Sequence, residues 1–224
     1  MNPGAEHLSV HFLTIVLNGE PFIRYHYQIL ENLPFRWHWH VVEGAAELRH
    51  DTAWACAYGG ALPDRFHTDG LSNDGTSEYL DRLRECDPCR VSVYRPPTGR
   101  LWDGKLEMVN APLAAITEDC LLWQLDVDEF WTVSQIVKTR QLFLNHPEKT
   151  AALFSCHFFI TPDLVVIDDI SSQHRLSENW LRVWRYSQDC RWKAHEPPIL
   201  EKILEDGSVV NIGQENPFSC QETS

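Results

Sequence analysis

The order of hydrophobic and polar positions predicts strands alternating with amphipathic helices in the first half of the chain. Residues 10–17 form a short apolar, β-branched run, which is typical of a strand buried on both faces. Apolar residues then recur at helical spacing from Phe22 to Leu33, between two prolines that suit a helix start and end. Residues 37–44 are aromatic and β-branched and run up to an acid and a glycine, which predicts a second strand. Two strands joined by a helix imply a parallel pair.

The same alternation continues to residue 145, and the pattern then changes. Residues 45–75 predict a short helix near 47–57 followed by a long surface loop rich in Gly, Asp and His. The further predicted elements of this half are helices at 77–86, 105–116 (interrupted by Pro112) and 133–145, and strands at 90–94 and 121–125. Beyond them, strands at 151–160, 164–167 and 181–186 follow one another with short turns, which is typical of an antiparallel or mixed sheet.

Length and composition favour one α/β domain over residues 1–224. A chain of 224 residues with 43% apolar content can bury a sizeable core, and it contains no repeat or flexible linker. The change of pattern divides the domain into a half at 8–131 and a half at 132–224. Residues 216–224 show no closing element, so we expect a short or truncated member of its class.

The charge of the chain narrows the possible ligands. It has 19 Lys and Arg against 32 Asp and Glu, a net charge of −13, which disfavours nucleic acid and anionic membranes as partners. A phosphate-bearing ligand would then need a divalent cation. The N-terminus lacks a basic region and its apolar run is too short for a signal peptide or a transmembrane segment. Together with seven irregularly spaced cysteines, this predicts a cytoplasmic protein with reduced thiols.

Three carboxylates stand directly after the apolar strand at 121–125. Asp126 and Asp128 are two residues apart, so in extended backbone both side chains point the same way and could share one ligand. Two carboxylates at a partly dry strand end need a cation or a basic group, and a hard divalent ion is their natural partner. The alternative is that both are solvated acids at a strand end. The pattern gives Glu129 no role.

Four ordered segments within residues 10–131 carry a family resemblance. They are Val-Leu-Asn18-Gly-Glu, Val-Val-Glu43-Gly, Gly-Lys105-Leu-Glu-Met-Val-Asn110-Ala and Leu-Trp-Gln-Leu-Asp126-Val-Asp128-Glu. The chain resembles glycosyltransferases of family 2 and their relatives. The resemblance implies a GT-A-like, Rossmann-type α/β sandwich, with a mainly parallel central sheet flanked by helices and an antiparallel or mixed C-terminal part.

The resemblance also implies roles for these residues. Asn18 and Glu43 would hold the nucleotide, and the helix with Lys105 and Asn110 would lie beneath the donor sugar. Asp128 would bind Mn²⁺ or Mg²⁺, and Asp126 the metal or hydroxyls of the donor. The implied reaction moves a sugar from a nucleoside-diphosphate sugar to an acceptor hydroxyl on a glycan, lipid or protein.

A base for the acceptor hydroxyl is expected in the second half of the chain. In Arg191-Trp-Lys-Ala-His195-Glu196-Pro-Pro, the prolines would fix a loop, His195 could bind the metal or a phosphate, and Glu196 could act as the base. Asp169, in the Asp-Asp pair at 168–169, competes for the role of base. The pattern does not distinguish inversion from retention. We also expect one or two of Trp102, Trp131 and Trp192 to line the pocket.

Three other classes of protein share parts of this pattern. A haloacid dehalogenase-type aspartyl phosphatase also carries Asp-x-Asp after a strand, but Phe130 stands where that family has Thr or Val. A sugar-phosphate nucleotidyltransferase needs a glycine-rich basic loop, which residues 18–21 lack. A non-catalytic sugar- or nucleotide-binding domain on the same fold is the third alternative.

Overall fold

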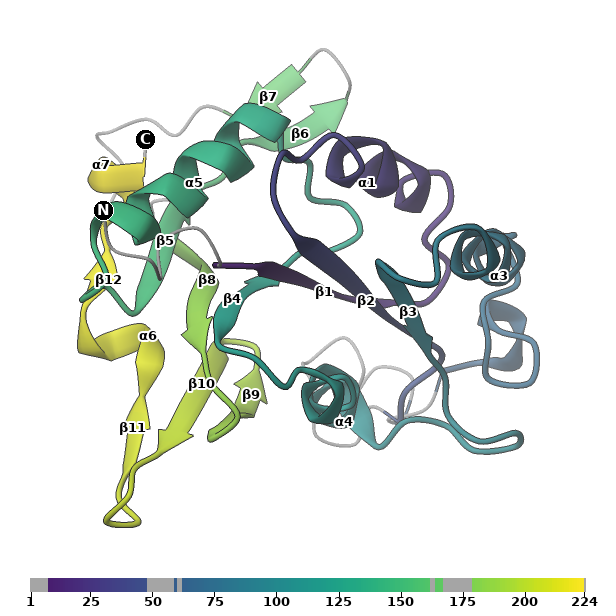
Figure 1. Cartoon of the computed structure of the whole chain (residues 1–224). Coiled ribbons are helices and arrows are strands. Elements are labelled where there is room, and N and C mark those ends of the chain that lie inside the picture. The colour runs from purple at the N-terminus through teal and green to yellow at the C-terminus, as the bar shows by residue number, and fades with distance from the viewer. Residues whose placement is uncertain (1–7, 48–58, 60–61, 162–163, 167–178, 224) are drawn as a thin grey trace.

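A seven-stranded mixed sheet forms the centre of the protein. The structure is a computed structural model and describes residues 8–47, 59, 62–161, 164–166 and 179–223. The sheet has the order β12-β5-β8-β4-β1-β2-β3 (Figure 1). Its strands are β1 (Val10–Val16), β2 (Trp37–Glu43), β3 (Val91–Tyr94), β4 (Cys120–Gln124), β5 (Ala151–Ser155), β8 (Asn179–Tyr186) and β12 (Pro217–Phe218).

The central sheet combines parallel and antiparallel pairs of strands. β1 runs parallel to β2 and β4, and β2 runs parallel to β3. β8 is antiparallel to both β4 and β5, so the direction changes where the second half of the chain joins the first. This confirms the predicted α/β class, with a parallel first part and a mixed C-terminal part.

The remaining elements flank the sheet or extend it. The helices are α1 (Ile23–Leu30), α3 (Thr76–Cys86), α4 (Gly104–Asn110), α5 (Val133–Asn145), α6 (Ile212–Glu215) and α7 (Cys220–Thr223), with 3-10 turns η2 (Asp64–Phe66) and η3 (Leu113–Ala115). β6 (Phe158–Thr161) and β7 (Leu164–Val166) form a hairpin, and β9 (Cys190–His195), β10 (Pro198–Ile203) and β11 (Val209–Asn211) form a small antiparallel sheet. The predicted break at Pro112 separates α4 from η3. The predicted helix at 47–57 lies almost wholly outside the described residues.

Side-chain alternation along the central strands gives the molecule a core on each face of the sheet. Phe12 and Trp123 point into a core that also contains apolar residues of α1, α3 and α5. Their neighbours Leu13 and Leu122 point into a second core, formed with α4, η3 and the small sheet. Figure 1 shows α1 and α5 on one side of the sheet and α4 on the other. Because both faces are covered, the ends of the strands are where a ligand can reach them.

Two predictions for the C-terminal part are wrong. Residues 216–224 do not lack a closing element, because Pro217 and Phe218 pair in parallel with β5 at the edge of the main sheet. Residues 191–198 are not mainly a loop, because most of them belong to β9 and β10. In β9, buried Cys190 and Trp192 alternate with exposed neighbours, which is the period of a half-buried strand. The prolines only mark the turn after β9.

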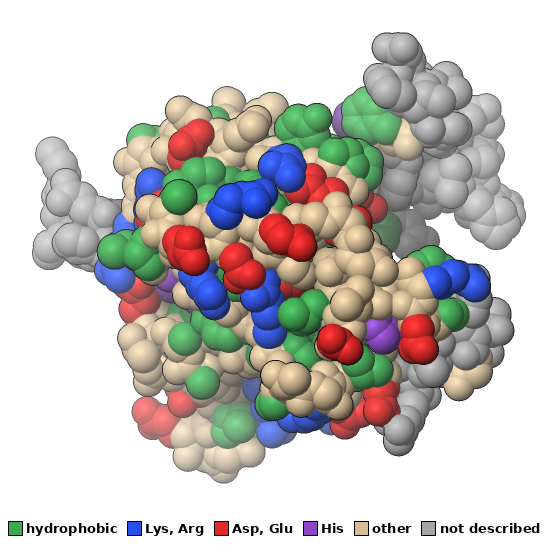
Figure 2. Space-filling view, turned by 90° about the vertical axis from the view of Figure 1, so that its right-hand side faces the viewer, with side chains coloured by type: hydrophobic (Ala, Val, Ile, Leu, Met, Phe, Trp, Pro, Cys, Tyr) green, Lys and Arg blue, Asp and Glu red, His purple; other side chains and the backbone are tan. Residues whose placement is uncertain are grey.

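The face formed by α1 and α3 offers no extended basic patch. In Figure 2, blue and red side chains lie interspersed on this face. Its arginines form short-range ion pairs with acids: Arg24 with Glu20, Arg84 with Asp81, and Arg90 with Asp87. Among the described helices, none is both long and apolar enough to cross a bilayer.

Candidate active site

A cavity of about 1160 Å³ opens at the carboxyl ends of the parallel strands. Ligands of open α/β sheets bind at this edge because the strand-to-helix connections meet there. Six residues that the sequence singled out line the cavity: Asn18, Lys105, Asp126, Asp128, His195 and Glu196. They come from the ends of β1 and β4, from α4, and from the turn between β9 and β10. The fold thus brings Asn18 and Glu196, which are 178 positions apart in the sequence, to the same cavity.

Asp126 is held by two neighbouring strands. Its Oδ2 accepts from Arg182 Nη2 at 3.2 Å, and its Oδ1 accepts from Gln124 Nε2 at 3.2 Å. Arg182 arrives on β8, where Val183 pairs with Trp123, so the guanidinium lies beside the end of β4. The sequence predicted that Asp126 and Asp128 need a cation or a basic group nearby. For Asp126, the buried Arg182 is that basic group.

Glu129 acquires a partner that the sequence did not reveal. Its carboxylate accepts from Arg182 Nε at 2.8 and 3.0 Å, and a further contact joins it to Nη2. Burial raises the pKa of Glu129, while the Arg182 guanidinium opposes that rise. Arg182 between the apolar Leu181 and Val183 was the signal for such a pair, because a buried arginine needs an acidic partner.

Gln124 presents a buried acceptor at the cavity wall. The residue is 4% exposed and lines the cavity, and its Nε2 lies 3.2 Å from Asp126 Oδ1 and 3.4 Å from His195 Nε2. Its Oε1 is buried and has no hydrogen-bond partner among the described residues. A buried carbonyl oxygen without a donor is costly to the folded state.

The carboxylates fit a divalent ion that is bound together with phosphates. Within the described ranges, no three His, Cys, Asp or Glu side chains gather into a ready-made metal site. Mg²⁺ in nucleotide enzymes is typically held by one or two carboxylates plus the phosphates of the substrate, so a preformed cage is not needed. Asp128 is exposed and lines the same cavity as Asp126. These two hard oxygen donors fit Mn²⁺ or Mg²⁺ in that mode.

Asn18 holds the loop that forms one wall of the cavity. Its Nδ2 donates to the Phe66 carbonyl at 2.7 Å, and its Oδ1 accepts from the Asn73 amide at 2.9 Å. Its own amide donates to Ser72 Oγ at 3.0 Å. Asn18 has φ of 58°, a left-handed conformation that asparagine tolerates better than most residues. The residue lines the cavity while its side-chain amide binds protein backbone.

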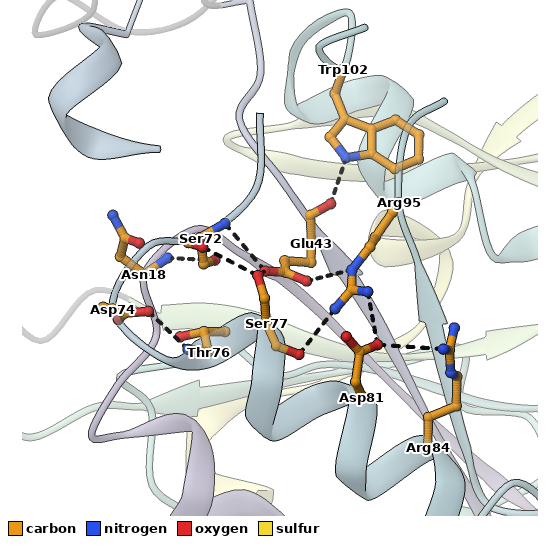
Figure 3. Close-up of polar contacts among 10 residues, drawn as sticks. All are labelled: Asn18, Glu43, Ser72, Asp74, Thr76, Ser77, Asp81, Arg84, Arg95 and Trp102. Atoms are coloured by element: carbon orange, nitrogen blue, oxygen red, sulfur yellow. Dashed lines mark hydrogen bonds and ion pairs between the residues drawn. The ribbon is translucent and has the colours of Figure 1, made fainter. Parts of the chain in front are cut away.

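Glu43 lies behind the cavity wall instead of facing the opening. It is fully buried, and its Oε2 accepts from Arg95 Nε at 2.7 Å. Its Oε1 accepts from the Ser77 hydroxyl and the Ser72 amide (Figure 3). Figure 3 also shows the Trp102 indole donating to the Glu43 carbonyl, at 2.9 Å. The Glu43 carboxylate thus joins β2 to the start of α3 and is not part of the cavity lining.

The helix α4 is tied to the small sheet. Asn110 Oδ1 accepts from the Trp192 amide at 2.9 Å, and its Nδ2 donates to the Trp192 carbonyl at 3.1 Å. This pair of bonds fixes β9 on α4 and so positions His195 at the cavity. At the other end, Lys105 Nζ lies 3.2 Å from Glu196 Oε2. Lys105 and Glu196 line the cavity, whereas Asn110 lies outside its lining.

The expected tryptophans do not line the cavity. Trp102 bonds the Glu43 backbone, Trp131 packs at right angles on Trp123, and Trp192 packs edge-on against Trp184. All three serve packing, because a large apolar ring gains most from burial. Trp180 lines the cavity in their place. Asp169, the alternative base, lies outside the described residues.

Comparisons with known proteins concern the fold. No family model matches the chain, and no curated protein matches it. A mannosyltransferase, PcManGT from Pyrobaculum calidifontis in complex with GDP-Man and Mn²⁺, aligns with a TM-score of 0.43 and 18% identity, covering 65% of this chain and 34% of its own. TarS from S. aureus aligns with a TM-score of 0.43 and 15% identity, covering 66% and 21%. A 4-diphosphocytidyl-2C-methyl-D-erythritol synthase aligns with a TM-score of 0.44 and 9% identity, covering 80% and 75%.

The chain spans about a third of the length of PcManGT and about a fifth of that of TarS.

Proposed function

We propose that the chain is a metal-dependent glycosyltransferase, which moves a sugar from a nucleoside-diphosphate sugar to an acceptor hydroxyl. The observation that carries the proposal is that Asp126 and Asp128 line one cavity at the carboxyl edge of the parallel strands. Its volume of about 1160 Å³ is at the upper end of small-molecule sites, which suits a ligand as large as a nucleotide sugar. PcManGT, solved with GDP-Man and Mn²⁺, illustrates the chemistry.

The proposed donor spans the cavity from the end of β1 to the turn after β9. Asp128 would hold Mn²⁺ or Mg²⁺ together with the diphosphate, and Lys105 would neutralise a phosphate oxygen. The half-buried Asp126 would accept hydrogen bonds from donor hydroxyls, because its carboxylate lines the cavity. Asn18 would contact the nucleotide through its position on the wall, and Glu43 would support that wall from behind.

In the proposed reaction, Glu196 takes the proton of the acceptor hydroxyl. The acceptor oxygen bonds to the anomeric carbon, the bond from that carbon to the diphosphate oxygen breaks, and its electron pair leaves with the diphosphate. A bound Mn²⁺ or Mg²⁺ would supply Lewis-acid stabilisation of the negative charge on the leaving diphosphate. His195, at the same wall, would donate to a phosphate oxygen or bind the metal. The acceptor would approach from the half at 132–224, which contributes Arg182 and Glu196.

An aspartyl phosphatase fits the geometry less well. Its nucleophilic carboxylate must be free to attack phosphorus, yet both oxygens of Asp126 are engaged by Arg182 and Gln124. The Asp-x-Asp pair also follows β4 instead of opening the fold. A non-catalytic nucleotide-sugar-binding domain would use the same cavity but would release no product.

The released product distinguishes these functions. The protein is incubated with a panel of nucleotide sugars and Mn²⁺, and nucleoside diphosphate, pyrophosphate and inorganic phosphate are measured in parallel. We expect nucleoside diphosphate from one donor and its loss after chelation by EDTA. Asp128→Asn should abolish this release, whereas Asp119→Asn, an exposed acid just before the other end of β4, should not. Phosphate release from a small phosphoester without nucleoside diphosphate from any donor would overturn the proposal.

A further inference from the structure

The two aspartates of the Asp-x-Asp pair have different surroundings. Asp126 uses Oδ2 to accept from Arg182 and Oδ1 to accept from Gln124. Asp128 is exposed to the cavity and forms no hydrogen bond or ion pair with any residue in the described part of the chain. One carboxylate is therefore already neutralised by the protein, and the other is available to a cation.

Arg182 is held in a position from which its guanidinium group contacts both Asp126 and Glu129. Its side chain is 3% exposed, and its Nη2 contacts both carboxylates. Its Nε is shared between the two Glu129 oxygens, and the guanidinium lies over the Trp180 ring at 4.8 Å from the ring centre. A planar guanidinium bound on three sides has little freedom to turn away from Asp126.

We propose that Glu129 and Arg182 act as a positioning pair, which reserves Asp126 for the donor and leaves Asp128 as the carboxylate for the metal. This rests on the proposed glycosyltransferase function for the identity of the donor. The tight turn after β4, closed by the Glu129 amide on the Asp126 carbonyl at 3.0 Å, brings three acids within four residues. Without Arg182, Asp126 would be available to a cation beside Asp128, and affinity for hard cations rises with the number of carboxylate ligands.

The pairing makes metal binding depend on the donor. With Asp126 held by Arg182, Asp128 alone gives a weak site for a free ion, and the donor phosphates must complete the coordination. The ion would then bind productively only together with its nucleotide. Glu129 contributes by holding Arg182 and does not itself touch the metal or the donor.

The test measures binding of Mn²⁺ alone, by electron paramagnetic resonance of the free ion, with no nucleotide present. Arg182→Met should bind Mn²⁺ at least about tenfold more tightly than the unaltered protein, because it frees Asp126 as a second carboxylate beside Asp128. The double variant Arg182→Met with Asp126→Asn should lose this gain. Arg185→Met is the matched control, because Arg185 lies on the same strand and contacts only backbone carbonyls through its hydrogen bonds. It should leave Mn²⁺ binding unchanged.

A second variant covers the case in which Arg182→Met does not fold. Glu129→Gln with Arg182→Met removes the buried charges as a pair and still frees Asp126, so it should also bind Mn²⁺ more tightly. The proposal is overturned if a folded variant lacking Arg182 binds Mn²⁺ no more tightly than the unaltered protein, or if the gain survives Asp126→Asn. Since no donor is used, this result is independent of whether any nucleotide sugar proves to be a substrate.

Discussion

Three histidines on the neighbouring strands β1 and β2 (His11, His38 and His40) predict that the protein loses stability in mild acid. His11 Nδ1 and His40 Nε2 lie 2.9 Å apart, His11 Nε2 lies 3.2 Å from Glu118, and His40 Nδ1 lies 3.0 Å from the Tyr94 hydroxyl. With both histidines neutral, one set of tautomers satisfies every hydrogen bond in this row: Tyr94 donates to His40, His40 donates to His11, and His11 donates to Glu118. The His38 ring lies 4.4 Å from that of His40. A proton added to His40 would therefore be buried and would face two other imidazoles.

The size of the effect follows from the pKa of His40. Burial, together with His38 and His11, lowers this pKa from 6.5 to about 2. The unfolded chain binds a proton below its pKa of 6.5 and the folded protein does not, so stability is complete above pH 6.5 and falls as the pH drops toward 2. Each pH unit in this window costs about 1.4 kcal/mol. Between pH 7.5 and 5.0 the loss from His40 is roughly 2 kcal/mol, and any folded-state pKa below about 4 gives the same result.

The assay is urea unfolding at pH 7.5 and at pH 5.0, followed by fluorescence of the nine tryptophans. His40→Gln removes the titrating ring and keeps an amide that can donate to His11. The variant should lose about 2 kcal/mol less stability than the unaltered protein between the two pH values. His146→Gln is the control, because the side chain of His146 is 51% exposed on the surface. Equal losses for His40→Gln and the unaltered protein would refute the reasoning.

Other predictions concern single contacts. Glu43→Gln should cost about 3 kcal/mol in urea unfolding, because it leaves the partly buried Arg95 without its main partner; a cost below about 1 kcal/mol would contradict the role of this pair. Thr132→Ala should cost about 1 kcal/mol, since Thr132 and Gln135 cap α5 reciprocally, and an unchanged denaturation midpoint would show the cap to be unimportant. Phe143→Ala should cost about 3–5 kcal/mol, because the ring is fully buried in the first core, and near-neutral stability would exclude that packing.

Elements with a strong local signal could be predicted from the sequence. β1, β2 and β4 consist mainly of apolar and aromatic residues, as is typical of strands covered on both faces, and these runs can be recognised in the sequence. Pro112 ends α4 through its missing amide, which needs no tertiary information. β9 was missed, because two prolines follow it and its alternation with Arg191 and Lys193 resembles that of a polar loop.

For the candidate site too, the positions of some residues could be predicted from the sequence and those of others could not. Sequence position placed Asn18, Asp126 and Asp128 at strand ends, and parallel strands bring such ends to one edge. Glu43 stands at an equivalent strand end, yet its side chain turns into the protein toward Arg95. Which way a side chain points at a strand end depends on its partners, and these lie far away in sequence.

The sequence by itself determined the α/β class, the order of the first strands and the place of the acids after β4. These properties come from periodicity and breaker residues, which act over a few positions. Only the tertiary structure decided that Arg182 neutralises Asp126, that Glu129 fixes Arg182, and that Asp128 lines the cavity with no hydrogen bond or ion pair to the residues the structure describes. The physical reason is that β8 runs antiparallel to β4, and such a pairing joins residues more than 50 positions apart that no local pattern connects.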